Sequence, residues 1–285
     1  MLWLLPALIV LTAFVYVPLV QNFGFATQRS NIFSGDSEFI GLRNFEVLIK
    51  DPIFWRSLFN NLLFAAVSVV CQVGGALVVA AAVESVRSRR LRQALRVIYF
   101  VPSAVSITVA GLLFYFIYEP DIGMLNGALN AVGLDSLTHA WLGQSSTAMI
   151  AIIIMSQWQG FGYTALLFTV AIQRVPGELY EAAQIDGIGP VRRFFSITVP
   201  LVREMSGLLT IVTVSGAFQV FNEVMVMTSG GPNNSTQVLG TWLYHNGFVR
   251  NDFGYAAAIA IVIFFVTLII GLVQLWYTRR RKVEL

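Results

Sequence analysis

Two groups of residues, most of them polar, lie within apolar stretches of the sequence, and their residue types could bind a polar ligand there. Members of the first group are spaced i, i+3, i+4 and i+7, which places them on one face of a continuous helix, and are Ser215, Phe218, Gln219 and Asn222. The second group surrounds two further aromatic residues and contains Gln157, Gln159, Gly160 and Tyr163. Amides and hydroxyls can hydrogen-bond to ligand hydroxyls, and aromatic faces can pack against C–H groups. These residues therefore predict a site for an uncharged, polyhydroxylated ligand such as a sugar.

The same side chains have an alternative role, because polar residues also hold helices together within membranes. The pattern of residues alone leaves ligand binding and helix packing both open. Glu223 is a lone carboxylate in the same stretch as Gln219. It could relay protons, but its position toward one end of the stretch favours a solvated or paired structural role.

The composition indicates which elements must position these residues. The chain is 56% hydrophobic and only 12% charged, about half the charged fraction of a soluble domain. Its apolar runs are long enough to cross a bilayer, and a backbone in hydrocarbon must form helices or a closed barrel. The runs are continuous rather than alternating, which favours helices. We therefore predict an all-α transmembrane protein with a single domain over residues 1–285 and six spans at about 2–23, 57–83, 97–118, 147–172, 204–228 and 255–277.

The first span follows Met1 directly, without a basic segment or a clear cleavage site, so we expect a retained span rather than a signal peptide. Basic residues then orient the bundle. They concentrate in the connection 84–96, in the loop 176–200 and in the C-terminal residues 279–282. Six spans put all three on one side, which the positive-inside rule makes cytoplasmic. Both termini are then predicted to be cytoplasmic. Since the basic residues follow membrane topology, they do not indicate nucleic-acid binding.

The cytoplasmic loop 176–200 is not a simple polar linker. Pro176 can begin a short helix, and Glu178 and Glu181 lie early in it, where negative charge suits the helix dipole. Residues 187–190, Gly-Ile-Gly-Pro, end that helix. A second turn over 191–197 follows, and Pro200 marks the entry to the next span. The loop is predicted to be a helix, a sharp corner and a second helix, although an ordinary amphipathic loop is an alternative.

This loop resembles the EAA loop of ABC-importer permeases. The residues that carry the resemblance are Glu181-Ala182-Ala183, Gly187, Ile197 and Val199-Pro200, in the spacing EAA, three residues, G, nine residues, I, one residue, L, P. Valine at 199 in place of the usual leucine is the one departure. In that family the loop is a coupling helix that docks on the ATPase subunit. The resemblance therefore implies that the ATPase contacts are made by Glu181, Ala182, Ala183, Asp186 and Gly187.

Residues 39–61, 230–236 and 253–260 further resemble the maltose-type branch of carbohydrate ABC-importer permeases, so that the resemblance covers nearly the whole chain. It implies a six-helix type I importer permease in a bacterial or archaeal cytoplasmic (inner) membrane. The implied partners are a second permease subunit, two ATPase subunits that bind ATP and Mg, and an extracytoplasmic sugar-binding protein. The implied substrate contacts are Gln159, Gly160, Tyr163, Ser215, Phe218, Gln219 and Asn222.

The sequence lacks residues that several other classes of function would require. The sequence has no phosphate-binding loop, and its only lysines are Lys50 and Lys282, so we expect no ATP hydrolysis, no catalytic or metal site and no cofactor in this chain. An ion-coupled carrier would show internal repeats and intramembrane charges. A polyol, glycerol phosphate or acidic oligosaccharide remains an alternative cargo. An anionic cargo would need a basic residue at the depth of the pocket, which the fourth and fifth spans lack, although the second permease could supply one.

Overall fold

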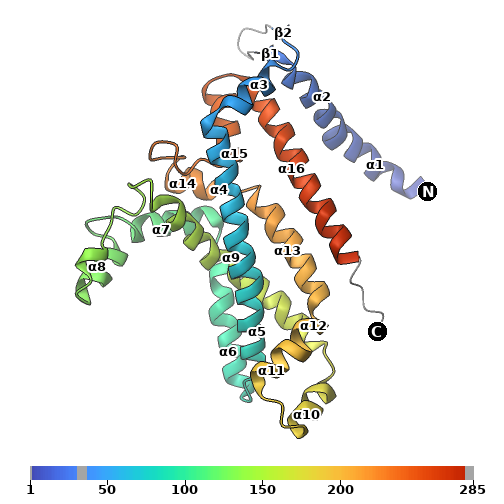
Figure 1. The fold of residues 1–285 in the computed structure, drawn as a ribbon, viewed down its shortest axis with the longest axis vertical. Coiled ribbons are helices and arrows are strands. Elements are labelled where there is room, and N and C mark those ends of the chain that lie inside the picture. Colours follow the sequence, from blue (N-terminus) through green and yellow to red (C-terminus); the bar gives the residue numbers. More distant parts are fainter. Residues whose placement is uncertain (1, 31–36, 280–285) are drawn as a thin grey trace.

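The computed structural model describes residues 2–30 and 37–279, and most of them are helical. Figure 1 shows long helices lying side by side, with shorter elements gathered at the two ends of the bundle. Within the described part of the chain, four helices are long and apolar enough to cross a membrane, and two bent helix pairs raise the number to six. The predicted all-α transmembrane architecture is confirmed, but two of the six spans are not straight.

The first span is a helix that packs against the last one. Asn22 Nδ2 donates to the Ala257 carbonyl at 3.3 Å, and the rings of Phe23 and Phe265 meet edge to face at 6.1 Å. A small antiparallel hairpin follows, with Gln28 opposite Phe39. The elements are a 3₁₀ turn Leu2–Leu4, α1 Leu5–Leu11, a π-helical segment Thr12–Tyr16, α2 Val17–Ala26, β1 Gln28–Ser30, β2 Ser37–Phe39, α3 Arg43–Lys50 and, as the last span, α16 Phe253–Arg279.

Two long helices form the centre of the bundle. The second span runs without a break over Pro52–Glu84, and Asp51 caps it by accepting a hydrogen bond from the Ile53 N–H at 2.8 Å. It consists of α4 Pro52–Ser68, a π-helical segment Val69–Gly75 and α5 Ala76–Glu84. The fourth span, α9 (Ala148–Gln173), packs against α4 and α5 and also against parts of the third and fifth spans. It therefore joins the elements that carry the candidate site.

The third span is bent, which corrects the prediction of one helix over 97–118. Arg89–Ala104 and Ile107–Ile117 meet at 94°, because the backbone is extended at Val105, where φ is −81° and ψ is 133°. Gln159 Nε2 donates to the Val105 carbonyl at 3.0 Å and so provides a hydrogen-bond partner for the backbone at the break. The elements are α6 Arg89–Phe100, a 3₁₀ turn Val101–Ala104 and α7 Ile107–Ile117.

The fifth span is interrupted too, so the prediction of one helix over 204–228 is wrong. Its first helix, α13 (Arg203–Ala217), ends at Ala217, and α14 (Asn222–Met227) begins after a non-helical segment. The side chain of Asn61 from α4 stabilises this break, because Nδ2 donates to the Ala217 carbonyl at 2.6 Å and Oδ1 accepts from the Leu239 N–H at 2.8 Å. In an apolar interior such backbone groups would otherwise be unpaired at high cost.

The remaining elements lie in the connections. Asn60 Nδ2 donates to the carbonyls of Ser235 and Gln237, both at 2.8 Å, and thereby fixes the loop after α14. Asn126 organises the connection before α9 by accepting from the indole N–H of Trp141 at 2.7 Å. These elements are α8 Met124–Ala131, a 3₁₀ turn Asp135–Leu137, α10 Gly177–Ile185, α11 Pro190–Arg193, a π-helical segment Phe194–Thr198, α12 Val199–Leu201, α15 Leu239–Tyr244 and a π-helical segment His245–Val249.

Candidate substrate cavity and coupling loop

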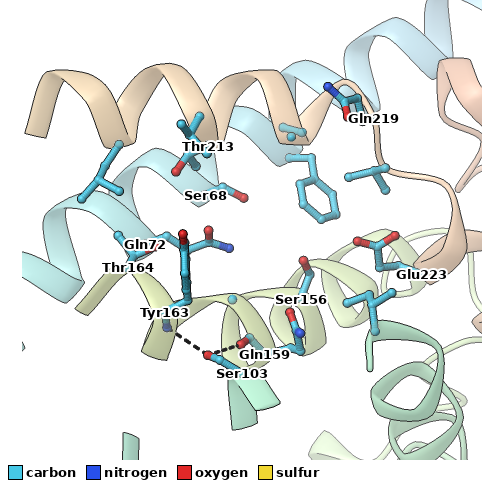
Figure 2. A pocket seen from close by; sticks show the side chains of 18 of the residues that line it. Ser68, Gln72, Ser103, Ser156, Gln159, Tyr163, Thr164, Thr213, Gln219 and Glu223 are labelled. Carbon is cyan, nitrogen blue, oxygen red and sulfur yellow. Dashed lines mark hydrogen bonds between the residues drawn. The ribbon is translucent and has the colours of Figure 1, made fainter. Parts of the chain in front are cut away.

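A cavity of about 460 Å³ lies among the second, third, fourth and fifth spans, where the third bends and the fifth is broken (Figure 2). This volume is within the range of small-molecule sites. Its polar lining consists of Ser68, Gln72, Ser103, Ser156, Gln159, Tyr163, Thr164, Thr213, Gln219, Asn222 and Glu223. The bend and the break therefore bring polar side chains from separate spans around one space.

Five of the seven residues that the sequence assigned to substrate line this cavity: Gln159, Gly160, Tyr163, Gln219 and Asn222. Phe218 and Ser215 are not in its wall. Phe218 is only 2% exposed and packs in a buried cluster with Leu239 and Trp242. Helical spacing does not place Phe218, because α13 ends at Ala217 and the chain is no longer helical at residue 218.

The hydroxyl of Ser103, at the bend of the third span, forms hydrogen bonds with the backbone of α9. It donates to the Gln159 carbonyl at 2.7 Å and accepts from the Tyr163 N–H at 3.0 Å (Figure 2). Gly162 lets the two elements approach, since a Cβ there would lie 2.1 Å from the Tyr99 carbonyl oxygen. The phenol of Tyr163 remains 54% exposed, so its ring and hydroxyl are available on the cavity wall.

Gly160 contributes space rather than a side chain. A Cβ at this position would lie 2.7 Å from Nε2 of Gln72, which comes from the π-helical segment of the second span. Glycine therefore allows an amide from another helix to reach the cavity. Sequence reasoning missed Gln72, Ser68 and Ser103. Gln72 and Ser68 are polar residues four positions apart in an apolar span, a signal that would have found them, whereas Ser103 beside Pro102 had no comparable signal.

The loop 176–200 forms the predicted helix, corner and second helix. α10 ends in a Schellman motif, in which Gly187 N–H donates to the Gln184 carbonyl at 3.1 Å and Ile188 N–H to that of Ala183 at 2.8 Å. Gly187 has φ +69°, a left-handed conformation that favours glycine. Tyr180 OH and Thr198 Oγ1 lie 3.0 Å apart and join α10 to the following helix. The corner is therefore an ordered turn that is fixed by hydrogen bonds and by the left-handed conformation of Gly187.

Exposure divides the residues of the predicted coupling motif. Ala183 is 4% exposed and faces inward, whereas Glu181, Ala182, Asp186 and Gly187 are exposed. Ile185 is 87% exposed at the end of the same helix. The loop therefore presents a mixed polar and apolar surface beyond the end of the helix bundle (Figure 1).

Comparison with known proteins then decides the family. Residues 72–283 match the family described as "Binding-protein-dependent transport system inner membrane component". The chain belongs to this family. A probable ABC transporter permease of Bacillus subtilis (strain 168) is 46% identical over 99% of this chain and 97% of its own length. A diacetylchitobiose uptake permease of Streptomyces coelicolor is 37% identical over 92% of this chain and 77% of its own length.

The fold of the permease is also that of a solved transporter. A chain of a bacterial ABC transporter involved in the import of the acidic polysaccharide alginate superposes with a TM-score of 0.86 at 24% identity. The match covers 99% of this chain and 95% of that chain. The ABC importer permease fold predicted from the sequence is therefore confirmed, and the protein is a multi-pass component of an inner membrane.

In this permease, Glu223 lies in the wall of the cavity, and Figure 2 shows its carboxylate beside the space enclosed by the four spans. Among the described residues it forms no ion pair, so of the two expected roles, solvated or paired, the structure leaves the solvated one. No lysine or arginine is among the residues lining the cavity in the described part of the chain. The lining is therefore neutral apart from one carboxylate.

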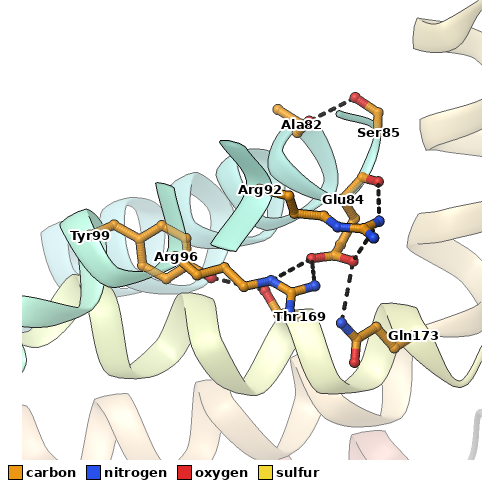
Figure 3. A network of polar contacts seen from close by, with 8 residues as sticks. All are labelled: Ala82, Glu84, Ser85, Arg92, Arg96, Tyr99, Thr169 and Gln173. Atoms are coloured by element: carbon orange, nitrogen blue, oxygen red, sulfur yellow. Dashed lines mark hydrogen bonds and ion pairs between the residues drawn. The ribbon is translucent and has the colours of Figure 1, made fainter. Parts of the chain in front are cut away.

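At the opposite end of α5, the permease carries a polar network around Glu84 (Figure 3). Arg96 donates to Glu84 from Nε at 3.0 Å and also from Nη2. Gln173 Nε2, at the end of α9, donates to the same carboxylate at 3.3 Å, and Arg92 forms an ion pair with it at 3.8 Å. This network links the second, third and fourth spans immediately before the loop 176–200.

Proposed function

We propose that this permease forms half of the translocation pore of an ATP-driven importer of an uncharged sugar. A second permease subunit forms the other half, two ATPase subunits bind ATP and Mg, and an extracytoplasmic sugar-binding protein delivers the cargo. Both termini of the permease are cytoplasmic in this proposal. The observation that carries the cargo assignment is the cavity lining, which offers amides, hydroxyls and a tyrosine from four spans.

The charge of the cavity favours an uncharged cargo over an anionic one. Glu223 would repel an acidic ligand, and no cationic side chain of the described cavity lining would compensate. Bringing an anion into a site of low dielectric without a partner is costly. The relative that takes up diacetylchitobiose is the more instructive comparison for this reason, whereas the alginate importer supports only the fold.

The coupling assignment is supported by how the loop is connected to the cavity. The helix Pro190–Leu201, which follows the corner, meets α13 at an angle of 72°. α13 in turn contributes Leu209, Thr213 and Ala217 to the cavity wall. A displacement of the exposed corner by an ATPase subunit would therefore reach the cavity through two helices that are consecutive in the chain and meet at this bend. For coupling, ATP and the loaded binding protein must each stabilise one conformation more than the other.

The assignment is tested by uptake into proteoliposomes that contain the assembled transporter. Replacing Tyr163 and Gln219 by alanine removes two exposed polar groups of the cavity. Two lost ligand hydrogen bonds correspond to about 2–3 kcal/mol, or roughly a 30- to 150-fold loss of uptake at low sugar concentration. Tyr16→Ala with Gln21→Ala provides the matched control, since both residues are exposed and lie outside the cavity. Assembly and basal ATP hydrolysis should remain in both double variants.

Normal uptake by the cavity double variant would remove the pocket from the proposal. The cargo class is tested separately by stimulation of ATP hydrolysis with neutral and acidic oligosaccharides, each delivered by the cognate binding protein. Stimulation by acidic cargo alone would overturn the assignment of an uncharged sugar. Transport driven by an ion gradient without ATP would overturn the importer class itself.

A further inference from the structure

The arginines at the start of the third span divide into two sets. Arg92 and Arg96 face inward and bind Glu84, whose side chain is 10% exposed (Figure 3). Arg87, Arg89 and Arg90 are exposed. Within the described residues these three form no ion pair with an acidic side chain. The network around Glu84 thus explains two of the five arginines and leaves three with their charge directed outward.

The exposed arginines continue into an apolar helix face. Residues 90, 94, 97 and 101 of the third span are spaced i, i+4, i+7 and i+11, and therefore lie along one side of it. Val97, Ile98 and Val101 on this side are between 54% and 68% exposed. An exposed apolar face on a membrane-spanning helix suits acyl chains, and Arg90 would then lie where the acyl region ends and the headgroups begin.

Helix length places the same point at the membrane surface. The second span has 33 residues over Pro52–Glu84, which corresponds to about 50 Å. The hydrocarbon core is only about 30 Å thick, so each end of this helix reaches the headgroup region. Residues 87–90 come three to six positions after Glu84, at the end of the bundle that carries α10 and α11 (Figure 1). The three exposed arginines therefore lie at headgroup depth.

We propose that Arg87, Arg89 and Arg90 form a binding site for the phosphate headgroup of an anionic phospholipid, with its acyl chain along the exposed face of α6. Charge complementarity selects an anionic lipid, since basic residues near a membrane surface attract anionic headgroups additively. Arginine also suits phosphate because its planar guanidinium donates two parallel hydrogen bonds. A bound lipid would stabilise the turn between α5 and α6 at the end nearest the loop 176–200.

The test uses the assembled transporter in detergent, titrated with phosphatidylglycerol and followed by native mass spectrometry. The inner triple variant carries Arg87→Gln, Arg89→Gln and Arg90→Gln. The outer triple variant carries Arg29→Gln, Arg43→Gln and Arg56→Gln, which are exposed arginines at the opposite end and remove the same charge. We expect the dissociation constant of the first bound lipid to rise about 5-fold per arginine, or roughly 100-fold in the inner triple variant. The outer triple variant should bind normally.

Further variants and competing ligands make the result decisive. The corresponding triple lysine variant should retain most of the binding, and the single change Arg90→Gln should weaken it about 5-fold if the triple variant does not assemble. Equal binding of phosphatidylcholine, or equal weakening in the outer triple variant, would overturn the proposal. Displacement by soluble glycerol phosphate would indicate a site for free phosphate instead. Loss of the ATPase subunits with unchanged lipid binding would identify a protein-docking surface and would also overturn it.

Discussion

The corner of the coupling loop contains two glycines, Gly187 and Gly189, that permit a test of backbone conformation by the same substitution at each. Gly187 and Gly189 are both exposed, and a Cβ at either position would meet no atom within 4 Å. They differ in backbone conformation, because φ is +69° at Gly187 and −65° at Gly189. Serine at each position adds the same side chain into open space. Gly187→Ser should disturb the corner, whereas Gly189→Ser should not.

The magnitude follows from the torsion. A left-handed conformation costs an L-residue about 1–2 kcal/mol relative to its preferred regions, and no steric contribution adds to it here. At Gly189 the conformation is ordinary, and serine is a good residue at the start of α11. We assume that the ATPase docks on the corner in the conformation described above. A conformational cost of about 1–2 kcal/mol then lowers the docking-competent population of Gly187→Ser about 5- to 30-fold.

The assay is the affinity of the ATPase subunits for the solubilised permease pair, with ATP hydrolysis stimulated by loaded binding protein as a second readout. Gly187→Asn separates strain from steric exclusion, because asparagine tolerates the left-handed region but is larger than serine. It should weaken docking less than Gly187→Ser. Equal affinities for Gly187→Ser and Gly189→Ser would refute the reasoning, and a larger loss with asparagine would show that bulk at the interface, not torsion, is limiting.

Two further predictions concern the packing that shapes the cavity. Gly162→Ala places a Cβ 2.1 Å from a backbone carbonyl oxygen, whereas the Cβ of Gly160→Ala meets only the end of the Gln72 side chain at 2.7 Å. Gly162→Ala should therefore lower the stability of the protein by about 1–3 kcal/mol, and Gly160→Ala should lower it less. Identical melting temperatures of the two variants in detergent would contradict this. Asn61→Leu leaves two buried backbone groups unpaired and should lower the stability of the protein by about 2–6 kcal/mol. The control Asn130→Leu, at an exposed position, should melt like the parent protein. A comparable loss of stability in both variants would show that the break does not depend on Asn61.

Long apolar runs and turn residues were sufficient to predict much of the fold. The fourth span was expected at 147–172 and is observed at Ala148–Gln173, because an uninterrupted apolar run in hydrocarbon has no stable alternative to helix. The corner at Gly187 was equally predictable, since the sequence Gly-Ile-Gly-Pro over residues 187–190 ends a helix through local torsions alone. Both features depend on neighbouring residues along the chain.

The candidate site was only partly predictable. Gln159, Tyr163 and Gln219 were found because their side chains are polar in apolar surroundings. Ser103 was missed, and Phe218 was assigned to the ligand although it is buried against α15 and α16. Both differences between the expected residues and the cavity wall arise where a span is bent or broken, because helical spacing no longer indicates which residues share a face.

The sequence by itself determined that the chain crosses a membrane as helices and where the loop 176–200 turns, since these follow from hydropathy and local torsion. Only the tertiary structure decided where the third and fifth spans break. Each break exposes backbone groups that must be satisfied by a side chain distant in sequence, Gln159 for Val105 and Asn61 for Ala217. Such pairings exist only once the helices are packed, and the cavity exists because of them.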